Sequence, residues 1–257
     1  MTLRFDPARY PGWRPDGPVL VHGGTTHPVA VAAAGPAAVH ADVDAPVLAP
    51  GAVRWVVAYG SNACPDRLVD KGLDRRGAVL LPARLRGWVA AFEARPTAYG
   101  AVPLTLVPAP EAEMVTWVLG VHVEDTATVD ASEGRVAEGV AEDGGGPADA
   151  RHAPAGAYRL AHVGPVVVAD RLQLADAVAF VPGPHTQVQV DDTGRWRRWP
   201  HVGQASAVAH LEAGGPSRDA PLVGEVVAGP WPASALRGRG APRPDGAGPA
   251  RGPVDHR

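Results

Sequence analysis

An apolar run that stops abruptly at a glycine constrains the fold of this chain more than any other feature. Residues 55–59 carry the β-branched and aromatic side chains typical of a strand, and a small polar turn, residues 60–62, follows directly. Pro65 then opens a short helical pattern that Gly72 ends, which is the usual punctuation of a helix. The sequence therefore predicts a strand, a tight turn and a helix N-terminus in immediate succession.

A turn of this kind has a chemical consequence. Backbone N–H groups at the start of a helix have no partner within the helix, and they attract carboxylate or phosphate. We therefore expect an anion site at residues 60–62. The plainer alternative is an ordinary connection in which Ser61 or Asn62 caps the helix. The two interpretations are compatible, because a capped helix end with spare donors still binds an anion.

Three short motifs, in this order, resemble those of the gamma-glutamylcyclotransferase-like superfamily. Tyr59-Gly60-Ser61-Asn62 after an apolar strand is similar to the signature loop of that family. The segment Val-Asp-Ala-Ser-Glu-Gly at 129–134 resembles its Leu-Asp-x-x-Glu-Gly motif. Gly-Ala-Tyr-Arg at 156–159 resembles the strand start that usually follows. The resemblance covers roughly residues 53–168.

The resemblance implies a fold of the α+β class, a small and mainly antiparallel β-barrel with a few short helices. It also implies a cofactor-free reaction in which the α-amino group of a γ-glutamyl unit attacks its own γ-carbonyl carbon, giving 5-oxoproline and a released amine or amino acid. The implied general acid/base is Glu133. The implied substrate-binding residues are Tyr59, Gly60, Ser61, Asn62 and Tyr158. The alternatives are a solvated helix-end glutamate for Glu133 and core packing for Tyr158.

The chain also departs from the family pattern. Ala63 and Cys64 follow the signature loop, where most relatives have Leu or Met. About twenty residues separate Gly134 from Gly156, where the family has only a few, and we expect an exposed loop at 139–154. The leaving group stays open between glutathione, a γ-glutamyl amino acid, a γ-glutamylamine and something unrelated.

Composition divides the chain into three sections. Residues 1–52 precede the resemblance, and two short strands around Gly23-Gly24 predict an extra hairpin followed by a linker. Residues 53–213 form the expected main domain, with helices at 124–132 and 205–213. Its expected strands after the signature loop are 79–85, 89–92, 105–107, 116–123, 158–163, 166–169 and 177–181. Residues 214–257 are rich in Pro, Gly and Arg and are expected to be a disordered tail.

Charge and cysteine content argue against several classes of protein. The formal net charge of -3 offers no overall basic surface, so we expect no nucleic-acid partner. Cys64 is the only cysteine, which rules out a disulfide within the chain. No apolar stretch approaches the roughly 18 residues of a membrane helix, and no secretory signal is evident, so we expect a cytoplasmic protein without a membrane partner. The scattered histidines lack ligand spacing, and we expect neither a metal nor a cofactor.

Four other features of the sequence allow more than one assignment. Cys64 lies at a helix start, where thiolates are stabilised, but no histidine is adjacent to it. His22-Gly23-Gly24 resembles a lipase oxyanion loop, but no Gly-x-Ser-x-Gly elbow occurs, which favours a hairpin turn. Arg67 lies one helical turn after the loop, where it could support a bound carboxylate, but it is expected to be a solvated helix residue. The aromatic and basic cluster at 195–199 is either a packing edge, a partner surface or a stacking platform for single-stranded nucleic acid.

Two further functions stay open at this point. One is a non-catalytic module of the same fold that binds a small anion or a peptide. The other is a scaffold whose 196–199 surface and C-terminal tail recruit a partner. The sequence leaves the oligomeric state open.

Overall fold

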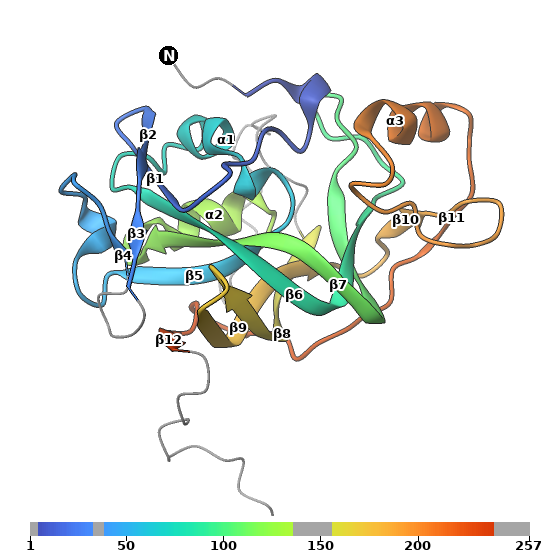
Figure 1. Cartoon of the computed structure of the whole chain (residues 1–257). Coiled ribbons are helices and arrows are strands. Elements are labelled where there is room, and N and C mark those ends of the chain that lie inside the picture. The colour runs from blue at the N-terminus through green and yellow to red at the C-terminus, as the bar shows by residue number, and fades with distance from the viewer. Residues whose placement is uncertain (1–4, 33–38, 136–155, 239–257) are drawn as a thin grey trace, which may run out of the picture.

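The structure is a computed structural model, and it describes residues 5–32, 39–135 and 156–238 (Figure 1). Within these ranges the strands are β1 (Val19–His22), β2 (Thr25–Pro28), β3 (Ala30–Val31), β4 (Val39–His40), β5 (Val53–Ala58), β6 (Ala78–Phe92), β7 (Leu104–His122), β8 (Tyr158–Val168), β9 (Leu172–Pro182), β10 (Gln187–Gln189), β11 (Ser217–Asp219) and β12 (Leu236–Gly238). The helices are α1 (Pro65–Asp70), α2 (Thr126–Ser132) and α3 (Gln204–Glu212). Short 3-10 turns occur at η1 (Pro7–Arg9), η2 (Pro46–Leu48), η3 (Ser61–Ala63) and η4 (Val123–Asp125).

Five of these strands close into a barrel. β5 pairs with β7, β7 with β6, β6 with β8 and β8 with β9, all antiparallel. β9 then returns to β5 in parallel, with Val57 opposite Ala179. Closure leaves these strands without the unpaired edges of an open sheet. The expected α+β class and the mainly antiparallel barrel are therefore confirmed.

Two long strands replace the four short ones expected between residues 79 and 123. β6 continues through Gly87, whose φ is +81°, and the register of the ladder shifts between Arg86 and Trp88. The glycine therefore forms a bulge that bends the strand instead of ending it. β7 continues through Pro108 and Pro110. Treating glycine and proline as strand ends was wrong here, because the pairing of β6 with β7 spans both irregular regions.

The expected N-terminal hairpin is confirmed. β1 and β2 pair antiparallel around Gly23 and Gly24, whose φ values of 58° and 75° suit the two-residue turn that matches strand twist. β1 also pairs with the start of β6, with Leu20 opposite Val79, so the hairpin extends the barrel sheet. The expected linker is only partly described, and its residue Val47 is buried in the core.

The expectation of a disordered tail from residue 214 was wrong for residues 214–238. β11 pairs with β10, and β12 pairs with β9 of the barrel. Trp231 is only 4% exposed, packs edge-on against Phe180 and donates its indole N–H to Asp130 at 2.9 Å. A few large apolar side chains order this segment through their burial. The average amino-acid composition of the segment does not reveal this effect. The rest of the expected tail, residues 239–257, lies outside the described residues.

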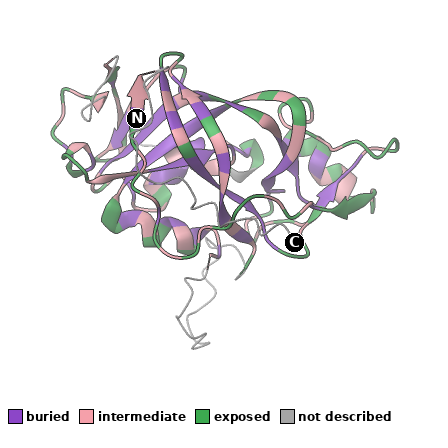
Figure 2. Ribbon diagram, turned by 90° about the horizontal axis from the view of Figure 1, so that it is seen from below, coloured by how far each residue is buried: buried purple, intermediate pink, exposed green. Residues whose placement is uncertain are grey.

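Side chains along the barrel strands alternate between two clusters of buried residues. Trp55 and Val57 of β5 belong to the larger cluster, whereas Val56 and Ala58 point to the opposite face. That second cluster includes Leu68 of α1 and Val129 of α2, so both short helices pack beside the end of β5. Figure 2 shows the buried residues running along the barrel strands and exposed residues on the surrounding loops.

Candidate functional site

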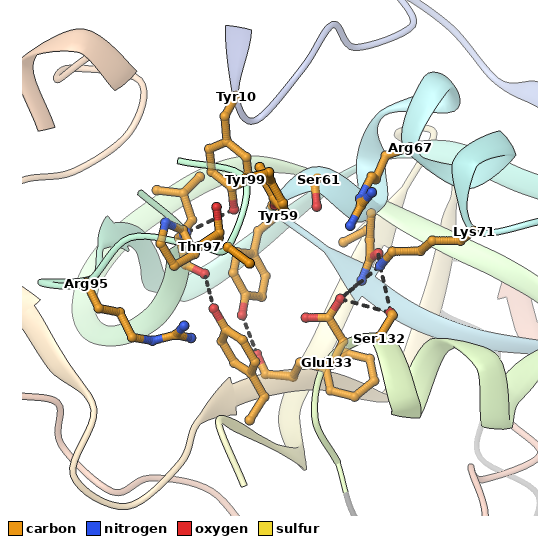
Figure 3. A pocket seen from close by; sticks show the side chains of 18 of the residues that line it. Tyr10, Tyr59, Ser61, Arg67, Lys71, Arg95, Thr97, Tyr99, Ser132 and Glu133 are labelled. Carbon is orange, nitrogen blue, oxygen red and sulfur yellow. Dashed lines mark hydrogen bonds and ion pairs between the residues drawn. The ribbon is translucent and has the colours of Figure 1, made fainter. Parts of the chain in front are cut away.

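A pocket opens where the chain leaves β5. Its volume is about 160 Å³, roughly ten times what a single water molecule needs on the same measure. All six residues that the sequence singled out line it, together with several that it did not (Figure 3). The six are Tyr59, Gly60, Ser61, Asn62, Glu133 and Tyr158. The structure thus brings the three motifs of the sequence to one cavity.

The turn at 60–62 is held from behind by Arg14, a residue of the N-terminal extension. Its guanidinium donates to the carbonyl oxygen of Gly60 at 2.8 Å and, at 3.4 Å, to that of Tyr59. Because a trans peptide is planar, the N–H groups of Gly60 and Ser61 then point away from Arg14. Neither amide has a backbone acceptor among the described residues. Arg14 therefore fixes the orientation of two spare donors at the pocket wall.

Glycine at position 60 is favoured by close packing rather than by a positive φ. Its φ is -96°, but a Cβ atom there would lie 3.1 Å from the hydroxyl oxygen of Tyr10. Tyr10 also belongs to the N-terminal extension, lines the pocket, and accepts a hydrogen bond from the backbone N–H of Leu104 at 3.0 Å. The extension is therefore part of the pocket wall, which its position outside the family resemblance did not indicate.

Glu133 reaches the pocket from the end of α2. It is the C-cap residue of that helix, and Gly134 follows with a φ of 66°, the left-handed conformation common just after a helix end. Its Oε1 atom accepts hydrogen bonds from Asn62 at 3.1 Å and from Lys71 at 3.0 Å. Its Oε2 atom has no hydrogen-bond partner among the described residues. Figure 3 shows this second oxygen directed into the cavity.

Lys71 is the central cation of this network. Its side chain is 5% exposed and that of Glu133 is 17% exposed. The ammonium also donates to Ser132 Oγ at 2.7 Å and to Asn62 Oδ1. Burial lowers the pKa of Lys71, although its ion pair with Glu133 opposes that effect. Lys71 is the only lysine in the chain, which is the one feature of the sequence that could have drawn attention to it.

Two tyrosines form the floor of the pocket as uncharged phenols. The hydroxyl of Tyr59 donates to the carbonyl oxygen of Phe180 at 2.6 Å, and that of Tyr158 donates to the carbonyl oxygen of Leu104 at 3.2 Å. Burial raises the pKa of both tyrosines well above its usual value. Tyr158 is therefore buried in the core and also lines the cavity.

Two arginines complete the charged lining. Arg67 of α1 is buried, so the expectation of a solvated helix residue was wrong. Its guanidinium lies over the rings of Phe5 and Tyr99, at 5.5 Å and 5.2 Å from their centroids, and forms an ion pair with Asp70 at 3.8 Å. Arg95 enters from the opposite wall and pairs with Glu93, whose carboxylate is fully buried.

Glu93 makes stability depend on pH, which leads to a prediction for Glu93→Gln. Burial raises the pKa of this carboxyl from 4.5 to about 7 in the folded protein, even though Arg95 opposes the effect. Between these values the folded protein keeps a proton that the unfolded chain has released. The contribution of Glu93 to the free energy of unfolding is therefore complete below about pH 4.5 and is lost as pH rises through about 7. The loss amounts to about 3 kcal/mol.

Urea unfolding at pH 5, 6, 7 and 8 measures this effect as the difference between wild type and variant. As pH rises from 5 to 8, we expect the wild type to lose stability relative to Glu93→Gln. Glu111→Gln, a change of an exposed acid on β7, serves as the control and should run parallel to the wild type. If the free energy of unfolding of Glu93→Gln also ran parallel to that of the wild type across this pH range, the raised pKa of Glu93 would be contradicted.

The remaining candidates from the sequence lie outside the pocket. Cys64 is fully buried, and burial raises the pKa of its thiol, which opposes nucleophilic use. His22 is in the β1–β2 hairpin, where its Nδ1 atom lies 3.0 Å from the carbonyl oxygen of Asp74. Trp199 packs beside Arg14, and Arg218 of β11 covers Trp196 at 4.1 Å. These contacts favour the packing interpretation of the cluster at 195–199.

The described residues contain neither a metal-binding cluster nor a membrane-spanning helix. In 5–32, 39–135 and 156–238, no group of three or more His, Cys, Asp and Glu side chains is placed to hold a metal ion. None of the helices in those ranges is long and apolar enough to cross a membrane. The expected exposed loop at 139–154 lies outside the described residues.

The fold and pocket define a class: an α+β barrel with a carboxylate, a lysine and spare backbone donors at one end. Comparison with known proteins adds little to this. No family model matches the chain, and no curated protein matches it. Among solved structures, a gamma-glutamyl cyclotransferase aligns with 53% of this chain and 72% of its own, at 15% identity and a TM-score of 0.38. A likeness of this extent carries no argument about function.

Proposed function

We propose that this protein is a γ-glutamyl cyclotransferase-like enzyme, which cyclises a γ-glutamyl group to 5-oxoproline and releases an amine or amino acid. The observation that carries the proposal is the convergence of the Glu133 carboxylate with the amides of Gly60 and Ser61 in one pocket. A γ-glutamyl group needs an acceptor for the proton of its amine and a donor set for its α-carboxylate. The two features supply one each.

The proposed reaction needs little from the protein beyond placement and proton transfer. The α-carboxylate binds at the turn, which brings the α-amino group within reach of Glu133 Oε2. That oxygen takes a proton as the nitrogen attacks the γ-carbonyl carbon and the C–N bond of the new ring forms. The same carboxyl then gives the proton to the departing nitrogen as the amide bond breaks. Because nucleophile and electrophile belong to one molecule, holding the right geometry contributes up to about 7–11 kcal/mol.

Lys71, Asn62 and Ser132 support the proposed role of Glu133. Lys71 and Asn62 donate to Oε1, and Ser132 accepts a hydrogen bond from Lys71, which leaves Oε2 to point at the substrate. A carboxylate tethered in this way loses the rotational freedom that would otherwise scatter its position.

The test is a panel of γ-glutamyl compounds offered to the purified full-length protein. Glutathione, γ-glutamylalanine and γ-glutamylethylamide cover a peptide, an amino acid and a simple amine as leaving groups. The measurement is 5-oxoproline by mass spectrometry over time. We expect release from at least one compound, in proportion to the amount of enzyme. Absence of 5-oxoproline from all of them, with a folded protein, would contradict the proposal.

A non-catalytic anion-binding module is the second candidate, and the charge of the pocket favours it. Arg67, Lys71 and Arg95 line the cavity, each ion-paired with one acid, and Glu133 is the one acid among the described lining residues. Three cations at the wall of a cavity attract carboxylates whether or not a reaction follows. A rise in melting temperature with L-glutamate, without 5-oxoproline from any compound of the panel, would support this candidate over the enzyme.

A further inference from the structure

Arg95 occupies the pocket wall across from the signature turn and Glu133 (Figure 3). It comes from the segment between β6 and β7, and its side chain is 32% exposed. Its Nε atom forms an ion pair with Glu93 Oε2 at 2.6 Å. Glu93 is 0% exposed, so the partner that holds the arginine is itself fixed in the core.

The geometry of this pair leaves the far end of the guanidinium available. Glu93 engages the Nε atom, and the two terminal nitrogens of Arg95 have no hydrogen-bond or ion-pair partner in the part of the chain that the structure describes. The guanidinium carbon lies 6.0 Å from the centroid of the Tyr158 ring, which also limits its movement. Terminal guanidinium nitrogens present two parallel donors, a geometry that matches a carboxylate.

The proposed function determines what this donor pair would meet. With the α-carboxylate at the amides of Gly60 and Ser61 and the amino group at Glu133, the leaving group must extend away from both. Arg95 lies on that opposite wall. Its charge is already oriented before substrate arrives, so binding a carboxylate there costs little reorganisation.

We propose that Arg95 is a specificity-determining residue, which binds a carboxylate on the leaving group and so favours γ-glutamyl amino acids over neutral γ-glutamylamines and amides. Glu93 acts through Arg95 as a positioning residue. This inference rests on the proposed function for the orientation of the substrate, but the subsite itself is read from Arg95 and Glu93.

The probes for the test are γ-glutamylalanine and γ-glutamylalaninamide, which differ only in a carboxylate and a neutral amide of similar size. Their binding is measured by calorimetry in Glu133→Gln protein, in which the proposed reaction is blocked. We expect the acid to bind about ten- to a hundredfold more tightly than the amide, the usual range for hydrogen bonds to a charged group. Adding Arg95→Met should reduce this preference to less than about twofold while leaving amide binding nearly unchanged.

Two matched variants separate charge from geometry and from general damage. Arg95→Lys keeps the charge but not the paired donors, so it should retain a preference between those of arginine and methionine. Arg75→Met removes an exposed arginine outside the pocket and should retain the full preference. If Arg95→Met also retains the full preference for the acid over the amide, or if neither probe binds, the inference is overturned.

Turnover by the wild type distinguishes this inference from the proposed function. If neither probe yields 5-oxoproline but the acid preference is present and is lost with Arg95→Met, the subsite stands and the enzyme proposal fails. If both probes are cyclised and the ratio of their kcat/KM values is the same with and without Arg95, the enzyme proposal stands and the subsite fails.

Discussion

Replacing Glu133 by glutamine should lower the release of 5-oxoproline by about a hundredfold to ten thousandfold, the usual range for loss of a general acid/base. The amide has nearly the size of the carboxylate, and its oxygen can still accept hydrogen bonds from Asn62 and Lys71, which now donate to Oε1. It cannot accept a proton from the substrate amine. The effect should therefore fall on kcat more than on KM, measured with the best compound of the panel.

The matched control for this prediction is Glu111→Gln, the exposed acid on β7 used above, which should leave turnover unchanged. Circular dichroism and the urea midpoint check that Glu133→Gln remains folded. Full turnover in a folded Glu133→Gln protein would show that another group carries the proton, and the assignment of Glu133 would then be wrong.

Replacing Lys71 by methionine should destabilise the fold by about 3 kcal/mol, near the lower end of the range for breaking a buried ion pair. The substitution keeps most of the length of the side chain but removes the cation from Glu133, Asn62 and Ser132. The lower end is expected because Glu133 faces the pocket, where water can partly solvate it. Turnover should fall as well, because Oε1 of Glu133 loses one of the groups that orient it.

A double-mutant cycle isolates the pair. The structure predicts that Lys71→Met costs much less in a Glu133→Gln background, since no uncompensated charge is then left in the pocket. Urea unfolding of the four proteins gives the coupling free energy directly. Equal costs of Lys71→Met in the two backgrounds would mean that the ammonium is held by Asn62 and Ser132 and not by the carboxylate.

Much of the local structure was predictable because its signals are short in range. The strand at 55–58, the turn after it and the helix from Pro65 follow from an apolar run, small polar residues and a proline. The β1–β2 hairpin follows from two glycines. Predictions failed where distant pairing outweighed local punctuation, as at Gly87 in β6, or where one buried side chain ordered a polar segment, as Trp231 does.

The candidate site divides in the same way. Two short motifs with a family resemblance indicated the turn and Glu133, because within each motif the residues that matter are adjacent in sequence. Tyr10, Lys71 and Arg95 of the pocket wall and Arg14 behind the turn were not predicted, because nothing around each of them in sequence specifies a partner. The Lys71–Glu133 contact joins residues 62 positions apart, and Arg14 reaches Gly60 across 46. Only closure of the barrel brings such segments together, and burial then makes their charges depend on one another.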